Sequence, residues 1–337
     1  MALSRHLKPR HARMHNLDQN KATPFRLKRV LLKIKGHQRL HALRELLFGS
    51  AEFIAHWALR LLPIDVCSNI GYVLGRIIGP MHRKPTQQLR ENITRLRPDM
   101  SSKKQIDAMV KRSWGNYGRV MAEFSVLRRI WRSNRTRVEG LENFTTAKAT
   151  GRPIICLFLH LGNWEVVGPK LNDVFGGNWL QIYQKIDDRM KLRIAENVRR
   201  PYAYALITAG PFIGKKIYNK LSEGYNLNLA VDEWVNDELN TPSFGRPRRQ
   251  VGNLTLAVRL AKLTNAILCP AYVTRTKGAR FLLHIKPPVI LDFTHFDRQA
   301  LQETVNQLDQ LIDPIIREHI DQWFYGSALK NTDKEII

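Results

Sequence analysis

The sequence predicts an α/β fold in which a central mixed sheet is covered by helices on both faces. From about Arg137 onwards, short apolar runs of strand length alternate with segments of helical periodicity. We expect strands at 136–138, 153–159, 179–183, 226–231, 266–273 and 280–286. We expect helices at 87–96, 103–127, 165–174, 189–198, 215–221, 254–263 and 298–320. Active sites in such folds gather at the carboxyl ends of strands.

The chain divides by composition into a basic tail (1–42), a helical region (43–82) and an α/β domain (83–330). Residues 43–80 are largely apolar at helical spacing, but charged residues and a histidine interrupt every stretch of 18. The region therefore suits N-terminal membrane-associating helices, and ordinary core helices are the alternative. Whether it spans a bilayer or lies on one stays open. Glycines spaced by four, at Gly71, Gly75 and Gly79, predict a helix face packed closely against a neighbour.

The 337-residue chain carries a formal net charge of +25, from 54 Lys and Arg against 29 Asp and Glu. Residues 1–40 alone hold eleven Lys or Arg and one acid, Asp18. Such a field attracts nucleic acid, phosphorylated lipid, an anionic membrane or an acidic carrier protein. Basic residues beside an apolar helix also mark the cytoplasmic side of a membrane. The three cysteines are far apart, which fits a reduced compartment.

The strongest candidate for chemistry is His160, which follows the apolar run 154–159 and precedes Glu165 by five positions. On one continuous helix the two side chains would diverge by roughly 140°. Gly162 and Asn163 supply a turn between them. The turn would let Glu165 hold the imidazole, so that His160 could activate a hydroxyl as a general base. The structural alternative is a histidine at a strand end and a carboxylate that stabilises a helix N-terminus.

Other polar residues occupy positions that suit a site at strand ends. Asp232 directly follows the apolar strand expected at 226–231. Arg199 belongs to a basic cluster near a strand end, where its planar guanidinium could bind a phosphate or carboxylate. The sequence contains no Cys/His cluster typical of zinc and no Gly-x-Ser-x-Gly motif, so we expect neither a zinc site nor an ordinary serine hydrolase.

The stretch His-Leu-Gly-Asn-Trp-Glu at 160–165 resembles the His-x4-Asp/Glu signature of the bacterial lipid A late acyltransferases, the lauroyl/myristoyl family. Further stretches that resemble the family in order and spacing are 114–119 with Glu123, Tyr183 with Arg199, 221–232, 244–252, 270–275 and 281–288. The resemblance runs from about residue 45 to 325. The chain departs from the family pattern at Gln184, at Glu233 and around Trp323, which leaves the acceptor and the acyl chain length open.

The resemblance implies a fold like that of the glycerolipid acyltransferases and transfer of a fatty acyl group to a hydroxyl of a lipid A precursor. It implies that His160 is the base and that Glu165 orients it. The residues that it implies for substrate binding or support of the site are Asn163, Arg199, Asp232 and Arg275. The expected donor is an acyl-acyl carrier protein, with no metal and no other cofactor.

The partners implied are the acyl carrier protein, a phosphorylated glycolipid acceptor and an anionic membrane. The implied location is the inner membrane, with the active site on the cytoplasmic side. Two other functions stay open. A related membrane acyltransferase could act on a lysophospholipid or another glycolipid. A basic nucleic-acid-binding protein would explain the net charge, but not the apolar region at 43–80.

Overall fold

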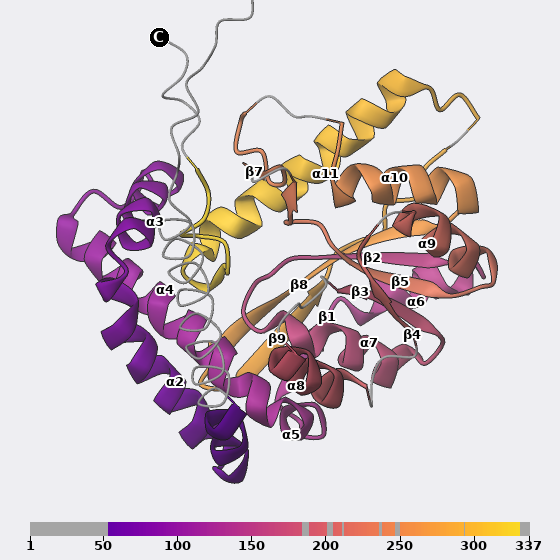
Figure 1. Ribbon diagram of the computed structural model, residues 1–337. Helices are drawn as coiled ribbons and strands as arrows, with labels where there is room; N and C mark the ends of the chain where they lie inside the picture. The colour runs from indigo at the N-terminus through magenta and orange to yellow at the C-terminus, as the bar shows by residue number, and fades with distance from the viewer. Residues whose placement is uncertain are drawn as a thin grey trace, which may run out of the picture. The chain divides into compact units, whose positions relative to one another are not determined.

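The computed structural model describes residues 53–183, 189–200, 205–210, 212–235, 238–246, 250–292 and 294–330. The predicted basic tail, 1–42, and the start of the predicted helical region, 43–52, lie outside these described residues. The described part contains a central sheet with helices on both faces, and a layer of helices that precedes the sheet in the sequence (Figure 1).

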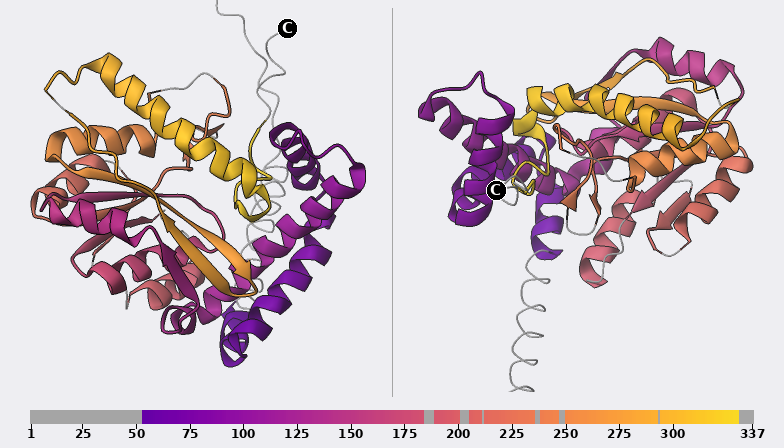
Figure 2. Two further views of the ribbon diagram at one scale, coloured as in Figure 1. Left: turned by 180° about the vertical axis from the view of Figure 1, so that it is seen from behind. Right: turned by 90° about the horizontal axis from the view of Figure 1, so that it is seen from above.

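Seven strands form the central sheet in the order β1–β9–β8–β2–β5–β3–β4 (Figures 1 and 2). The strands are β1 (Thr136–Glu139), β2 (Ile154–Phe158), β3 (Trp179–Tyr183), β4 (Ala205–Thr208), β5 (Asn226–Ala230), β8 (Ile267–Lys277) and β9 (Arg280–Ile285). Strands β8, β2, β5, β3 and β4 run parallel. Strands β1 and β9 run the other way, because β9 pairs antiparallel with β8. The sheet is mixed, as predicted, and β6 (Trp234–Val235) and β7 (Glu238–Leu239) form a separate antiparallel pair.

Helices cover both faces of this sheet. They are α5 (Leu127–Trp131), α6 (Leu141–Ala149), α7 (Val167–Phe175), α8 (Arg189–Arg199), α9 (Ile213–Ser222), α10 (Asn253–Thr264) and α11 (Arg298–Glu318). Strand β2 sends alternate side chains into two cores. Ile155 and Leu157 pack in one core with α9, α10 and α11, and Cys156 packs in the other with α5, α6 and α7. All five residues of β2 are buried, as expected for a strand covered on both faces.

Helices α2 (Ile64–Ile78), α3 (Arg83–Leu96) and α4 (Lys103–Glu123) precede the sheet in the sequence. Glycines allow α2 to approach α4 closely. A Cβ atom added to Gly71 would lie 2.4 Å from the carbonyl oxygen of Gly118, and one added to Gly75 would lie 2.2 Å from that of Trp114. A Cβ on Gly79 would meet the ring of Trp114 at 2.3 Å. The predicted close-packing face of glycines is therefore confirmed.

The other side of α2 is apolar and exposed. The exposed apolar residues of α2, with one from the 3₁₀ turn that follows it, are Val66, Val73, Leu74, Ile77, Ile78 and Met81. The helical residues 53–61 before α2 expose Ile54, Trp57 and Leu61 as well. Within the described part of the chain, no helix is both long enough and apolar enough to cross a membrane.

The sequence prediction did not include the two-residue strands β6 and β7, the short helix α5, strand β4 or helix α6. Strand β4 has only four residues at the edge of the sheet, a length that gives little periodicity. Helix α6 buries only Phe144 and Ala147, so its apolar stripe is too thin to indicate a helix. The helix expected at 103–127 ends at Glu123 and continues as a short 3₁₀ turn and α5.

Candidate active site

Strand β2 delivers His160 to the carboxyl end of the sheet. The strand lies between β8 and β5, and its buried apolar run continues through Leu159. The side chain of His160 keeps 17% of its surface exposed, so a substrate atom can reach the ring. His160 therefore lies at the end of a central parallel strand, the position that the sequence pattern predicted.

Asp232 lies beside His160 because β5, the strand that precedes it, is the neighbour of β2. The backbone N–H of His160 donates to both carboxylate oxygens of Asp232, at 3.1 and 2.9 Å. The ring atom Nδ1 of His160 lies 2.8 Å from Oδ1. The indole Nε1–H of Trp323 donates to Oδ2 at 2.9 Å. The Asp232 carboxylate is fully buried, and these donors hold it in one position.

This arrangement selects one tautomer of the neutral imidazole. An ionised carboxylate only accepts hydrogen bonds, so Asp232 keeps the ring proton on Nδ1. The other nitrogen, Nε2, then carries a lone pair and can accept a proton from a substrate hydroxyl. The roles are those of the acid and the histidine in a serine-protease triad. The geometry therefore supports general-base chemistry at His160.

Glu165 has a different partner from the one expected. It lies in η3 (Trp164–Val166), is 6% exposed and forms an ion pair with Arg199 from α8. Arg199 Nε donates to Glu165 Oε2 at 3.1 Å, and Arg199 Nη2 donates to Oε1. Burial lowers the pKa of Arg199, but the charge and hydrogen bonds of Glu165 outweigh this effect and raise the pKa overall. The Glu165 carboxylate thus balances the charge of Arg199, and Asp232 takes the position on the imidazole that the sequence assigned to Glu165.

The turn between His160 and Glu165 has the predicted form. Gly162 adopts a left-handed conformation with φ of 58°, and its N–H donates to the carbonyl of Gln322 at 3.1 Å. A Cβ at this glycine would lie 2.7 Å from the carbonyl oxygen of Val273, so the turn also needs a residue without a side chain. Asn163 then caps η3 by accepting from the N–H of Glu165 at 3.3 Å.

Asn163 and Arg275 meet at a third carboxylate, that of Glu123 in α4. Asn163 Nδ2 donates to Glu123 Oε2 at 2.9 Å, and Arg275 donates from Nη1 and Nη2 at 2.5 and 2.9 Å. Ser68 in α2 donates to the same carboxylate at 2.6 Å. Glu123 is fully buried and the Arg275 side chain is 5% exposed. These contacts tie the turn after His160 to α4 and β8, which is a supporting role rather than an exposed binding surface.

Aromatic rings surround the histidine. Trp164 meets the His160 ring edge-on at 4.9 Å between centroids, and Tyr325 does so at 5.1 Å. The N–H of Phe324 donates to the carbonyl of His160 at 3.0 Å, which brings the C-terminal segment over the site. Burial, together with the charges of Asp232 and a neighbouring glutamate, raises the pKa of Tyr325, so its phenol stays neutral at physiological pH. The imidazole therefore lies beside a largely apolar wall.

Together, these features define an α/β enzyme that can use a histidine base, held by a buried carboxylate, to activate a hydroxyl. The family model described as bacterial lipid A biosynthesis acyltransferase matches residues 34–326. The chain therefore belongs to the bacterial lipid A biosynthesis acyltransferase family, and it is an acyltransferase. No curated protein gives a significant match to the chain.

The structure brings the sequence-derived residues together in three groups. Asp232 joins His160, Arg199 joins Glu165, and the group around Glu123 is the third. Sequence reasoning missed the contacts of Asp232 with His160 and Trp323 and the central place of Glu123. One signal pointed to the contact between Asp232 and His160. Asp232 directly follows a buried strand, and it lies at the same sheet edge as His160 if the two strands are parallel neighbours.

Proposed function

We propose that this acyltransferase catalyses a late acylation of lipid A, in which a fatty acyl group passes from an acyl-acyl carrier protein to a hydroxyl of a lipid A precursor. Membership of the lipid A acyltransferase family supports the reaction class. The observation that carries the catalytic assignment is the 2.8 Å contact between His160 Nδ1 and Asp232, which leaves Nε2 as a base.

In this proposal the hydroxyl oxygen of the acceptor attacks the thioester carbonyl carbon while His160 Nε2 takes the hydroxyl proton. The tetrahedral intermediate then collapses, the carbon–sulfur bond breaks, and the imidazolium returns the proton to the departing thiolate. A general base of this kind contributes roughly 10²–10⁴ in rate. Asp232 stabilises the imidazolium that forms between the two proton transfers.

Glu165 and Arg199 have a different part in the proposal. Their ion pair leaves the Arg199 side chain 21% exposed, and its guanidinium remains charged. Arg199 can therefore attract an anionic group of a substrate towards the site, with Glu165 as the residue that positions it. Asn163 and Arg275 act through the Glu123 carboxylate and hold the turn that follows His160.

The exposed apolar stripe of α2 supports action at a membrane surface. An amphipathic helix with such a stripe can lie in the bilayer interface, where a lipid acceptor is accessible. The excess of basic residues favours an anionic leaflet and an acidic carrier protein. We therefore place the enzyme on the cytoplasmic side of the inner membrane.

The proposal is tested by acyl transfer with the purified full chain. His160→Ala should lower kcat by about 10²–10⁴-fold, since the contribution of the general base is lost. The matched control is His295→Ala, because His295 is exposed on a loop before α11. If folded His160→Ala keeps wild-type turnover, the base assignment is wrong.

The donor and the acceptor are tested separately with the wild-type chain. The expected result is transfer from acyl-acyl carrier protein to a lipid A precursor, at a much higher kcat/KM than from acyl-coenzyme A. A lysophospholipid acceptor provides the competing arm. Faster acylation of the lysophospholipid would contradict the proposed acceptor and leave the His160 mechanism intact.

A further inference from the structure

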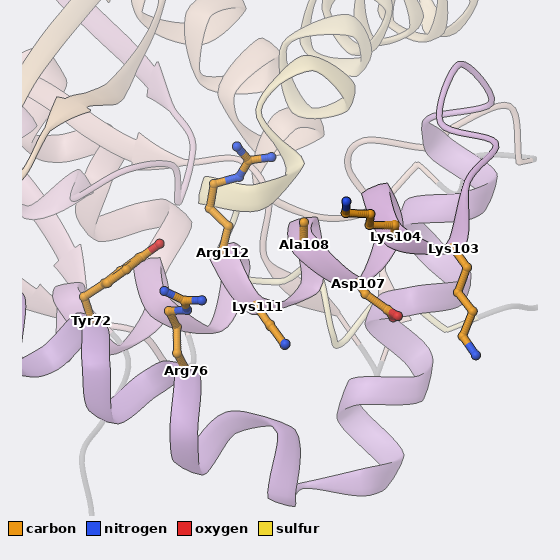
Figure 3. A pocket seen from close by; sticks show the side chains of 8 residues that line it. All are labelled: Tyr72, Arg76, Lys103, Lys104, Asp107, Ala108, Lys111 and Arg112. Atoms are coloured by element: carbon orange, nitrogen blue, oxygen red, sulfur yellow. The ribbon is translucent and has the colours of Figure 1, made fainter.

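A basic pocket lies at the seam between α2 and α4, apart from the residues around His160 (Figure 3). It has a volume of about 800 Å³ and is open to solvent. Its polar lining comes from Tyr72 and Arg76 of α2 and from Lys103, Lys104, Lys111 and Arg112 of α4. Figure 3 shows Tyr72 and Arg76 on one helix and the other labelled residues along the neighbouring helix, with Arg112 pointing away from Lys111. None of these residues takes part in the mechanism proposed above.

The pocket carries an excess of positive charge. Five Lys and Arg side chains line it against a single carboxylate, Asp107. That carboxylate already has a partner outside the pocket, because Arg90 donates to it. Arg112 pairs with Asp321 at 3.1 Å, which leaves the other four cations in excess. A concave surface lined by one sign of charge concentrates ions of the opposite sign.

The pocket borders the exposed apolar stripe of α2. Arg76 directly precedes Ile77, which is 61% exposed, so their side chains are turned by about 100° from each other. Arg76 therefore stands at the edge of the stripe, on the side that faces the pocket. The same helix thus offers an apolar surface and, at its flank, a group of cations. An apolar surface flanked by cations matches a lipid, whose acyl chains adjoin a phosphate-bearing head group.

We propose that this pocket binds the phosphorylated head group of a lipid, with the adjoining acyl chains against the apolar stripe of α2. The head group could belong to a bilayer phospholipid or to the phosphorylated acceptor, and the shared chemistry is the phosphate. Arg76 can hold phosphate oxygens, the lysines add charge, and the hydroxyl of Tyr72 offers a further donor. The proposal rests on the proposed function only in placing the enzyme at a lipid surface.

The first test measures binding of the full chain to vesicles by co-sedimentation. Wild type should prefer phosphatidylcholine vesicles that contain phosphatidylglycerol to phosphatidylcholine vesicles alone. The double variant Lys104→Glu, Lys111→Glu should lower the partition coefficient for the anionic vesicles by at least about tenfold. Each Lys or Arg near an anionic membrane surface adds to the electrostatic attraction, and the variant replaces two of them with acids. The matched control is Lys215→Glu, Lys216→Glu in α9, which makes the same charge change at exposed residues far along the chain.

The second test measures acyl transfer to an acceptor dissolved in detergent, where no bilayer contributes. If the pocket holds a bilayer phospholipid, the pocket variant loses vesicle binding and keeps the wild-type KM for the acceptor. If it holds the acceptor phosphate, the KM rises at least about tenfold and kcat stays near wild type. Either result supports the pocket and names its source.

Three outcomes would decide against the proposal or separate it from the catalytic one. Unchanged vesicle binding together with an unchanged KM in the pocket variant would overturn it. Equal losses in the pocket variant and in the α9 control would overturn it too, because net charge alone would then explain the binding. Absence of acyl transfer by wild type, with pocket-dependent vesicle binding, would refute the proposed function and support the pocket. Circular dichroism confirms that both variants fold.

Discussion

Replacing Asp232 by Asn tests the base geometry most directly, because the change keeps the shape of the side chain and removes one acceptor. The new amide group has two possible orientations. If it replaces Oδ2, it faces two donors, the backbone N–H of His160 and the indole N–H of Trp323. Each buried donor left without an acceptor costs about 1–3 kcal/mol. If it replaces Oδ1, it faces Nδ1 of the His160 ring and the backbone N–H of His160, but that N–H keeps its shorter hydrogen bond to the oxygen at the Oδ2 position.

The second orientation costs less, and it has a chemical consequence. An amide N–H that points at Nδ1 requires a lone pair there, so the ring proton moves to Nε2. Nε2 can then no longer accept the proton of the acceptor hydroxyl. We expect Asp232→Asn to lower kcat by about 10²–10⁴, or about 3–5 kcal/mol of transition-state stabilisation, with little change in stability.

The assay is acyl transfer from a labelled acyl-acyl carrier protein, combined with nitrogen-15 NMR of the histidines to identify the tautomer of His160. The comparison variant is Glu165→Gln, which retains a hydrogen-bond partner for Arg199 and should lose about tenfold at most. The reasoning about Asp232 is refuted if Asp232→Asn keeps a third or more of the wild-type kcat. A larger loss in Glu165→Gln than in Asp232→Asn would return the orienting role to Glu165.

Three further variants and one control probe the framework. Gly75→Ala should lower the free energy of unfolding by about 1–3 kcal/mol, because its Cβ would lie 2.2 Å from the backbone of α4. Gly210→Ala, which meets nothing within 4 Å, should change it by less than about 0.5 kcal/mol; chemical denaturation in detergent measures both. Glu123→Gln removes the counter-charge of the buried Arg275, so the same measurement should show a loss of about 3–5 kcal/mol. Burial and a neighbouring arginine lower the pKa of His56, so the unfolded chain takes up this proton at a higher pH than the folded chain. The melting temperature should therefore be highest above about pH 6.5 and should fall as the pH drops below that value. The variant His56→Gln should show a weaker dependence of the melting temperature on pH.

Local patterns were sufficient to predict several parts of the fold and site. The apolar run before His160 predicted a buried strand, and β2 is such a strand. The Gly162–Asn163 pair predicted a turn, which the positive φ of Gly162 confirms. Glycines spaced by four predicted the close contact of α2 with α4. Each of these features depends on neighbours within a few positions, and for that reason the sequence alone reveals it.

The partner of His160 depends on contacts between distant parts of the chain. Asp232 is 72 residues further along, and it reaches the imidazole only because β5 pairs with β2 rather than with β8 or β4. Strand order of this kind follows from how all the helices and strands pack, and no local spacing encodes it. The same holds for Glu123, which gathers Arg275 from 152 positions away. Spacing within one motif therefore favoured Glu165, the carboxylate that is near in sequence.

The separate partners of the two carboxylates suggest how base chemistry and substrate binding are kept independent. Asp232 fixes His160 through its ring and its backbone N–H, and the adjacent strands hold both residues. Glu165 instead fixes Arg199, which comes from α8 at the margin of the site. A rotation of Arg199 to meet an anionic substrate would therefore leave the hydrogen bonds of the imidazole unchanged. Changes in α8 can therefore alter substrate preference, while the pairing of β2 with β5 keeps the geometry of His160 and Asp232 unchanged.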